Sequence, residues 1–200
     1  MSLLDQSVSD LLGVFAAGRT TPGAGSAAAL TGAIAGSLIQ AAARYALRAA
    51  GKAGASAPFG ERAAAILEDA GERSRHLARA VEEDSEAFRR FWQTRTEEAL
   101  RLAIDVPIDI AEHCLALAGM GLELYDKGFE NARGEAAAAS LGAVASGEAA
   151  VYAASLNLVS AGTADWIDSR QEKIHALGRG LRNVRGRIET RIAPGLDWTA

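Results

Sequence analysis

A glycine-rich loop that leads directly into a helical pattern is the segment with the clearest capacity to bind a small ligand. It reads RTTPGAGSAAAL from Arg19 to Leu30. We expect the loop to end at Gly25 and an alanine-rich helix to follow, with Ser26 as its N-cap. The free N–H groups and partial positive charge of such a terminus could hold a small anion or a polar ring, although an ordinary capped turn also explains these residues. The loop lacks the lysine and the glycine spacing of a P-loop.

Two carboxylates are candidates for proton transfer. Glu135 follows Gly134 in a segment of small residues, where burial would raise the pKa of its carboxyl group toward neutrality. The alternative is a first-turn glutamate that interacts favourably with the helix dipole. Asp84 lies in an acidic run, which is also typical of a solvated helix face. Asn157 lies in an apolar helical pattern and, if buried, must hydrogen-bond either a ligand or another helix.

The histidines and the cysteine do not predict a reactive or metal-binding cluster. His76, His113 and His175 are far apart in the sequence and have no metal-ligand spacing, so we expect no metal. Cys114 follows His113 directly, and adjacent helical side chains cannot face each other for nucleophilic catalysis. We expect Cys114 to be a small buried residue, and a single cysteine fits a reducing cytoplasm.

The composition is that of a globular, helical protein. The chain of 200 residues is 49% hydrophobic and 23% charged, and we assign residues 1–200 to one domain. Many alanines, 21 glycines and only 6% aromatic residues favour closely packed helices. A formal net charge of −4 argues against nucleic acid as a partner. Residues 1–10 lack the parts of a signal peptide.

Two long segments, Thr20–Ala43 and Glu135–Ala164, carry few charges, but small polar residues interrupt both. We interpret them as helices buried against protein rather than as membrane spans. Because they supply little side-chain volume for a core, we expect them to pack against each other and against a second copy of the chain, at least as a dimer. The predicted fold class is an all-α, single-domain bundle of about six helices. The expected helices are Leu3–Ala17, Ser26–Ala50, Glu61–Gln93, Thr94–Leu124 with a kink or restart at Pro107 near Asp105, one from the Gly128–Gly134 turn to Val159, and Asp165–Ile192.

Several motifs, in order along nearly the whole chain, resemble those of the cyclodeaminase and methenyltetrahydrofolate cyclohydrolase family, which includes the C-terminal domain of formiminotransferase-cyclodeaminase. The segment Thr20–Leu30 resembles the family's P-T-P-G-G-G-S-A-A-A-L signature. The further matches are Glu83–Phe88 to D-x-x-A-F, Ala103–Ala111 to A-x-x-V-P-L-x-I-A, Gly128–Ala139 to G-N-x-N-A-x-S-D-L-G-V-A, and Ser155–Leu158 to x-I-N-L.

This resemblance implies an all-helical dimer with a folate-binding cleft. It also implies that water adds to a methenyl bridge on tetrahydrofolate, or that a formimino group on it releases ammonia, without a metal or redox cofactor. Carried over by position, Glu135 is the acid/base and Asp84 shapes the pocket. The remaining residues implied to hold substrate are Thr21, Pro22, Gly23, Gly25, Ser26, Asn131 and Asn157.

The chain departs from the family pattern at positions that matter for chemistry. Gly134-Glu135 replaces the family's Ser-Asp pair, Ala24 replaces a glycine, and Thr20 replaces a proline. A displacement of about 1 Å in a catalytic group can lower a rate on the order of a hundredfold. Three interpretations therefore stay open: a folate cyclohydrolase or cyclodeaminase, a hydrolase of another imine or amidine, and a ligand-binding or scaffold protein without turnover.

Overall fold

The computed structural model describes residues 2–53, 59–161 and 165–192. Within them the chain forms six α-helices and two short 3-10 helices, and none of these residues forms a strand. The all-α prediction is therefore confirmed. In order, the elements are η1 (Leu3–Asp5), α1 (Val8–Ala16), α2 (Ala24–Ala53), α3 (Gly60–Thr94), α4 (Glu97–Lys127), η3 (Glu130–Ala132), α5 (Arg133–Val159) and α6 (Ile167–Ile192).

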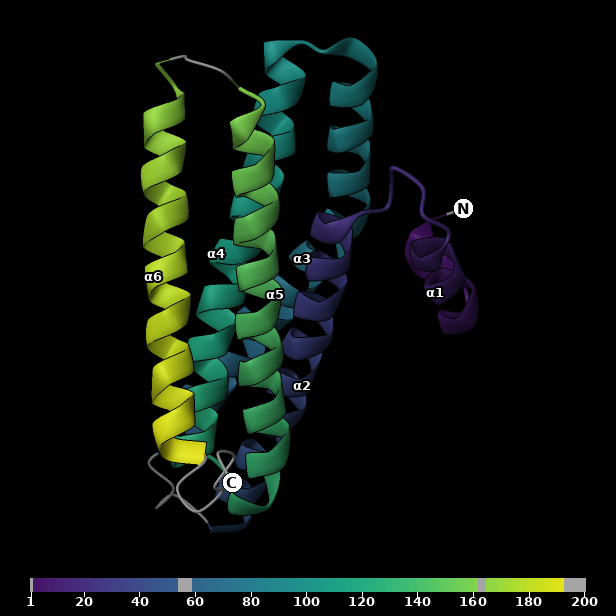
Figure 1. Cartoon of the computed structure of the whole chain (residues 1–200). Coiled ribbons are helices and arrows are strands. Elements are labelled where there is room, and N and C mark those ends of the chain that lie inside the picture. Colours follow the sequence, from purple (N-terminus) through teal and green to yellow (C-terminus); the bar gives the residue numbers. More distant parts are fainter. Residues whose placement is uncertain (1, 54–58, 162–164, 193–200) are drawn as a thin grey trace, which may run out of the picture.

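The five long helices form an up-and-down bundle in which consecutive helices run antiparallel (Figure 1). Helix α2 packs against α3, α4 and α5, while α6 covers α4 and α5. Helix α1 lies apart from the bundle at its N-terminal side (Figure 1). The amphipathic helix expected at Leu3–Ala17 is thus divided into η1 and α1, and the side chains of Val8 and Leu12 in α1 are exposed among the described residues.

Most helix boundaries agree with the sequence pattern, with two corrections. Helix α2 begins at Ala24, so Ser26 lies inside its first turn and is not the N-cap; the Ala27 N–H donates to the Gly23 carbonyl oxygen at 3.0 Å. Pro107 does not restart α4, which is continuous from Glu97 to Lys127. The break expected at Gly51–Gly60 lies partly outside the described residues, as does the end of the segment Glu135–Ala164.

Helix α2 approaches its neighbours closely because three of its glycines face them. A Cβ atom at Gly32 would lie 2.8 Å from Cys114 Sγ, and one at Gly36 would lie 2.9 Å from Ser74 Cβ. A Cβ atom at Gly25 would overlap the carboxyl group of Asp84. These positions lie seven and four residues apart, so they share one face of the helix. Small residues on this face fix the distance between α2 and the helices around it.

Helix α2 contains an apolar stretch, Ala24–Gly51, long enough to cross a membrane, and 56% of its most apolar window is buried inside the bundle. Helices α3, α4 and α5 pack against it, and its Ile39 and Ala43 are fully buried. This burial supports the interpretation of α2 as a core helix. Cys114 is likewise fully buried, as expected, and burial raises the pKa of its thiol to about 12.

We predict that Gly36→Ala destabilises the protein and that Gly51→Ala, in the same helix, does not. The new methyl group at position 36 would press on Ser74, and overpacking of this kind costs about 1–3 kcal/mol. No atom of the described residues lies within 4 Å of a Cβ atom at exposed Gly51, and an alanine in a helix is favoured over glycine by about 0.5–1 kcal/mol. Thermal unfolding of the two variants measures the difference. Equal melting temperatures would contradict close packing at Gly36.

Candidate functional site

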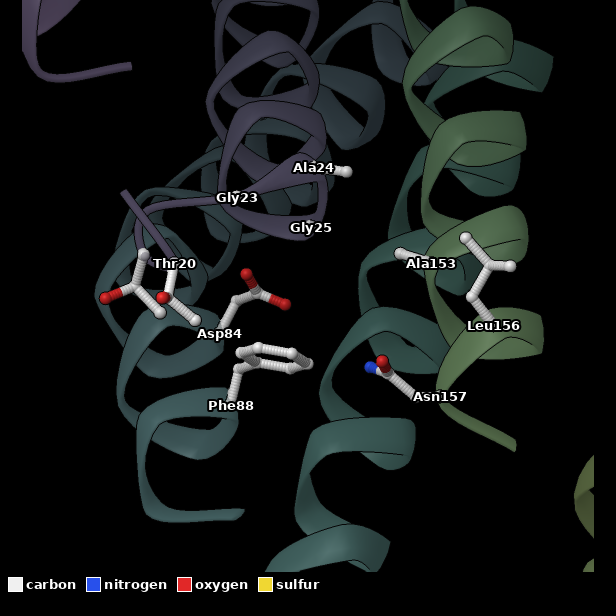
Figure 2. A pocket seen from close by; sticks show the side chains of 10 residues that line it. Thr20, Gly23, Ala24, Gly25, Asp84, Phe88, Ala153, Leu156 and Asn157 are labelled. Atoms are coloured by element: carbon white, nitrogen blue, oxygen red, sulfur yellow. The ribbon is translucent and has the colours of Figure 1, made fainter. Parts of the chain in front are cut away.

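A pocket of about 180 Å³ lies where the N-terminus of α2 meets α3 and α5 (Figure 2). Its walls come from the glycine-rich loop, from the middle of α3 and from the C-terminal end of α5. The structure thus brings together three segments that are far apart in the sequence. The lining residues are Thr20, Thr21, Gly23, Ala24, Gly25, Asp84, Phe88, Ala153, Leu156 and Asn157.

Asp84 is the one carboxylate among these lining residues, and its side chain reaches the first turn of α2. It is only 8% exposed. The fully buried Ser26 hydroxyl donates to Asp84 Oδ2 at 2.8 Å and lies 3.0 Å from Ser85 Oγ. Gly25 has no Cβ atom, and this absence makes room for the carboxyl group against the helix backbone. The position of the Asp84 carboxyl group therefore depends on both Gly25 and Ser26.

Burial raises the pKa of the Asp84 carboxyl group, and hydrogen bonds from the Ser26 side chain and backbone offset only part of this effect. A carboxyl group with a raised pKa in a concave site is suited to give and take a proton near neutral pH. The N–H groups of the first turn of α2 have no partner within the helix and carry a partial positive charge. The pocket therefore combines a proton-transferring group with donors for a polar or anionic group.

Asn157 forms the opposite wall of the pocket, and its position depends on Pro107. Proline has no N–H, so the Ala103 carbonyl oxygen in α4 lacks the partner that residue 107 would otherwise provide. The Asn157 amide Nδ2 donates to this oxygen at 2.6 Å. This bond joins α5 to α4 through the amide nitrogen and does not use the amide oxygen of Asn157, whose side chain lines the pocket (Figure 2).

The ring of Phe88 lies between Asp84 and Asn157 in the pocket (Figure 2). Phe88, and Ala153 and Leu156 of the α5 wall, were not predicted as site residues from the sequence. Phe88 follows Asp84 by four residues, a spacing that places both on the same face of a helix. This spacing is the signal that could have identified it.

Two predicted site residues lie elsewhere in the chain. Glu135 is in the first turn of α5, whereas the pocket residue Asn157 is near the end of the same helix. Glu135 and Asn157 are therefore about 33 Å apart along the helix axis. Glu135 is half-buried rather than buried, and Asn131 is exposed in η3. Within one chain, neither reaches the pocket. Pro22 is half-buried in the loop but is not among the lining residues.

The sequence predicts no cluster of histidines, but two of the three histidines lie close together in the structure. His76 of α3 and His113 of α4 face each other, with ring centroids 4.1 Å apart. Burial, and then the neighbouring His76, lower the pKa of His113. This cluster lies outside the pocket, because neither residue is among those that line it.

We predict that Asp84→Asn stabilises the folded protein, and more so as the pH rises. The unfolded chain ionises this carboxyl group at a lower pH than the folded chain does. The wild type therefore loses stability relative to the variant as the pH rises from about 4 to above the folded pKa.

Thermal unfolding across this pH range measures the effect, with Glu83→Gln as the control. Glu83 is the exposed neighbour of Asp84 on α3, so its replacement should leave the pH profile unchanged. The same profile for both variants would show that burial does not disfavour the Asp84 carboxylate.

Both the fold and the sequence of the chain are similar to those of known proteins. The crystal structure of formiminotetrahydrofolate cyclodeaminase from Thermotoga maritima superposes with a TM-score of 0.84 at 18% sequence identity, covering 94% of this chain and 96% of that chain. This similarity shows the fold. No curated protein matches the chain. The family described as formiminotransferase-cyclodeaminase matches residues 7–176, and the chain belongs to this family.

Proposed function

We propose that the protein acts on the carbon–nitrogen bridge of a reduced folate. It would either add water to the methenyl form or release ammonia from the formimino form. Membership of the family supports a one-carbon folate enzyme. The observation that carries the proposal is the buried Asp84 carboxyl group, which faces a pocket at the N-terminus of α2.

In this proposal Asp84 is the acid/base. It takes a proton from the attacking water in the hydrolytic reaction, or gives one to the departing ammonia in the deamination. The raised pKa of its carboxyl group supports both roles. The ring of Phe88 offers a flat face for a heteroaromatic ring, and the Asn157 amide oxygen can accept a hydrogen bond from that ring.

The reaction as proposed needs no metal or redox cofactor. Asp84 is the one carboxylate among the residues that line the pocket, and none of them is a histidine or a cysteine, whereas a zinc centre ordinarily takes three or more such protein ligands. Water or the substrate's own amine would be the nucleophile. A diffusible folate as substrate accords with our expectation of a cytoplasmic location.

The first experiment separates Asp84 from Glu135. Loss of 5,10-methenyltetrahydrofolate is followed by absorbance, and ammonia release from the formimino derivative is measured in parallel, both against enzyme-free controls. Asp84→Asn should lower kcat on the order of a hundredfold or more, the usual contribution of an acid/base. Glu135→Gln and Glu83→Gln should retain activity, because both lie outside the pocket of the chain.

The opposite pattern would assign the chemistry differently. Activity that survives in Asp84→Asn and disappears in Glu135→Gln would make Glu135 the acid/base and would contradict the role of Asp84. Saturable folate binding without turnover by the wild type would identify a ligand-binding protein, and neither binding nor turnover would direct the search to another amidine or imine.

We also propose that the chain functions as a homodimer. A pocket of about 180 Å³ is smaller than the 300–1,000 Å³ typical of small-molecule sites, and Leu156 at its rim is 71% exposed. An exposed apolar stripe continues from this rim along α5, with the spacing of three and four residues typical of a helix-packing seam. It consists of Leu141, Ala145, Ala149, Tyr152, Leu156 and Val159.

The dimer is tested by charge substitutions at two matched positions. Leu141 in the α5 stripe is 43% exposed, and Leu102 on α4 is 39% exposed. Leu141→Glu should shift the protein toward monomer in size-exclusion chromatography with light scattering, because a buried unpaired charge opposes association. Leu102→Glu should not change the mass. A monomeric wild type, or the same mass for both variants, would contradict this interface.

A further inference from the structure

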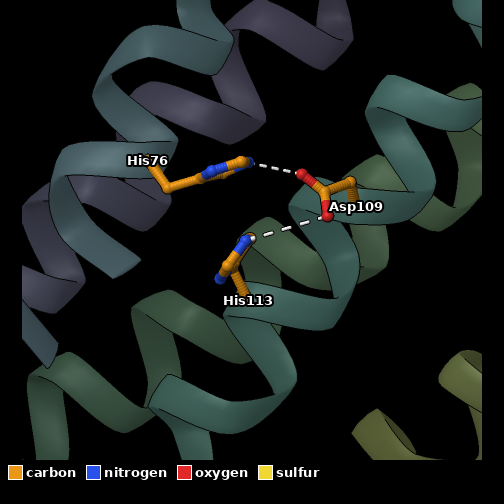
Figure 3. Close-up of side chains that lie close together, drawn as sticks. All are labelled: His76, Asp109 and His113. Atoms are coloured by element: carbon orange, nitrogen blue, oxygen red, sulfur yellow. Dashed lines mark hydrogen bonds and ion pairs between the residues drawn. The ribbon is translucent and has the colours of Figure 1, made fainter. Parts of the chain in front are cut away.

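Two histidines and an aspartate converge on the face where α3 meets α4, away from the pocket (Figure 3). His76 comes from α3, while Asp109 and His113 come from α4. Asp109 and His113 are four residues apart, a spacing that places both side chains on one face of the helix. The antiparallel packing of α3 against α4 brings His76 to the same point.

We propose that His76, Asp109 and His113 form a binding site for a divalent transition-metal ion such as zinc, which would link α3 to α4. Their ligand atoms all lie within 4.8 Å of one another. His76 Nε2 hydrogen-bonds Asp109 Oδ2, and His113 Nε2 lies 3.8 Å from Asp109 Oδ1. Both rings therefore direct the same nitrogen toward one carboxylate.

The donor set matches the chemistry of zinc. Zinc is commonly held by two histidines and a carboxylate, with water as the fourth ligand and metal–nitrogen distances of about 2.0–2.1 Å. Small rotations of the three side chains would bring their ligand atoms to such distances from one ion. The side chains of His76, Asp109 and His113 are 30%, 45% and 21% exposed, so the site is open to solvent on one side, where an ion can reach it and water can complete its coordination.

Arg73 is the charged neighbour that competes with a cation at this site. Its guanidinium Nη1 lies 3.2 Å from His113 Nδ1, while its Nε donates to Asp69 Oδ1 at 2.7 Å. A metal on Nε2 of His113 requires a proton on Nδ1, which would face the guanidinium donors. Arg73 is partly exposed and would turn toward Asp69 and solvent when the ion binds. The nearby acid Glu112 is paired with Lys173 at 2.9 Å.

The site is independent of the proposed folate chemistry. His76 precedes Asp84 on α3 by about 12 Å along the axis, and none of the three ligands lines the pocket. The ion would therefore act as a cross-link between two helices. Its stabilisation of the folded state would grow with the logarithm of the ratio of its concentration to its dissociation constant.

The test uses the untagged full chain, stripped with a chelator and titrated with zinc chloride by isothermal calorimetry. We expect one zinc ion per chain and a rise in melting temperature with excess zinc. His76→Gln and His113→Gln should each weaken binding at least about a hundredfold, more than the loss of a group that only orients a ligand. Cobalt(II) bound in place of zinc should give the intense visible absorption of a four-coordinate ion.

His175→Gln is the matched control, because His175 is an exposed histidine of α6 outside the cluster. It should bind zinc as the wild type does. Arg73→Gln should bind zinc more tightly, since it removes the competing charge and its amide oxygen can accept from His113 Nδ1–H. Circular dichroism verifies that each variant is folded. No saturable zinc uptake by the wild type, an equal loss in His175→Gln, or weaker binding in Arg73→Gln would overturn the assignment.

Discussion

The close approach of α2 to its neighbours is the constraint on which the rest of the bundle depends. It is possible because Gly25, Gly32 and Gly36 present backbone rather than side chains to α3, α4 and α5. Buried hydroxyls then reach the helix backbone: Ser74 Oγ donates to the Ala33 carbonyl oxygen at 2.9 Å, and Ser146 Oγ donates to that of Ala28 at 2.5 Å. The small-residue composition is therefore the means by which polar groups come close to α2 without being left unpaired.

How far the sequence predicts this structure depends on how local each feature is. The helical periodicity and the loop before α2 are local patterns, and they gave correct elements. The N-cap prediction for Ser26 was wrong because α2 begins two residues earlier, at Ala24, and the partner of its side chain, Asp84, belongs to another helix. His76 and His113 were separated in the prediction for the same reason, since only the antiparallel packing of α3 and α4 brings them together. Local spacing could not reveal either contact.

The candidate site shows the same limit. Resemblance to family motifs selected the loop, Asp84 and Asn157, which the structure places around one pocket. It also selected Glu135, in the first turn of α5, and Asn131, in η3 just before that helix. A motif records that residues recur together but not whether they share a site in one chain. Phe88, by contrast, lies in the pocket as a consequence of helical geometry alone, four residues after Asp84.

The two walls of the pocket belong to different helix pairs, and this division explains how its width is set. Asp84 is held against α2 through Ser26, whereas Asn157 of α5 is held against α4 through the carbonyl oxygen that Pro107 leaves free. The distance between the carboxyl group and the amide therefore follows from the packing of α2 on α5, where small residues leave little freedom to adjust. A site that must position a proton donor opposite a hydrogen-bonding group gains its precision from this rigid contact rather than from the loop.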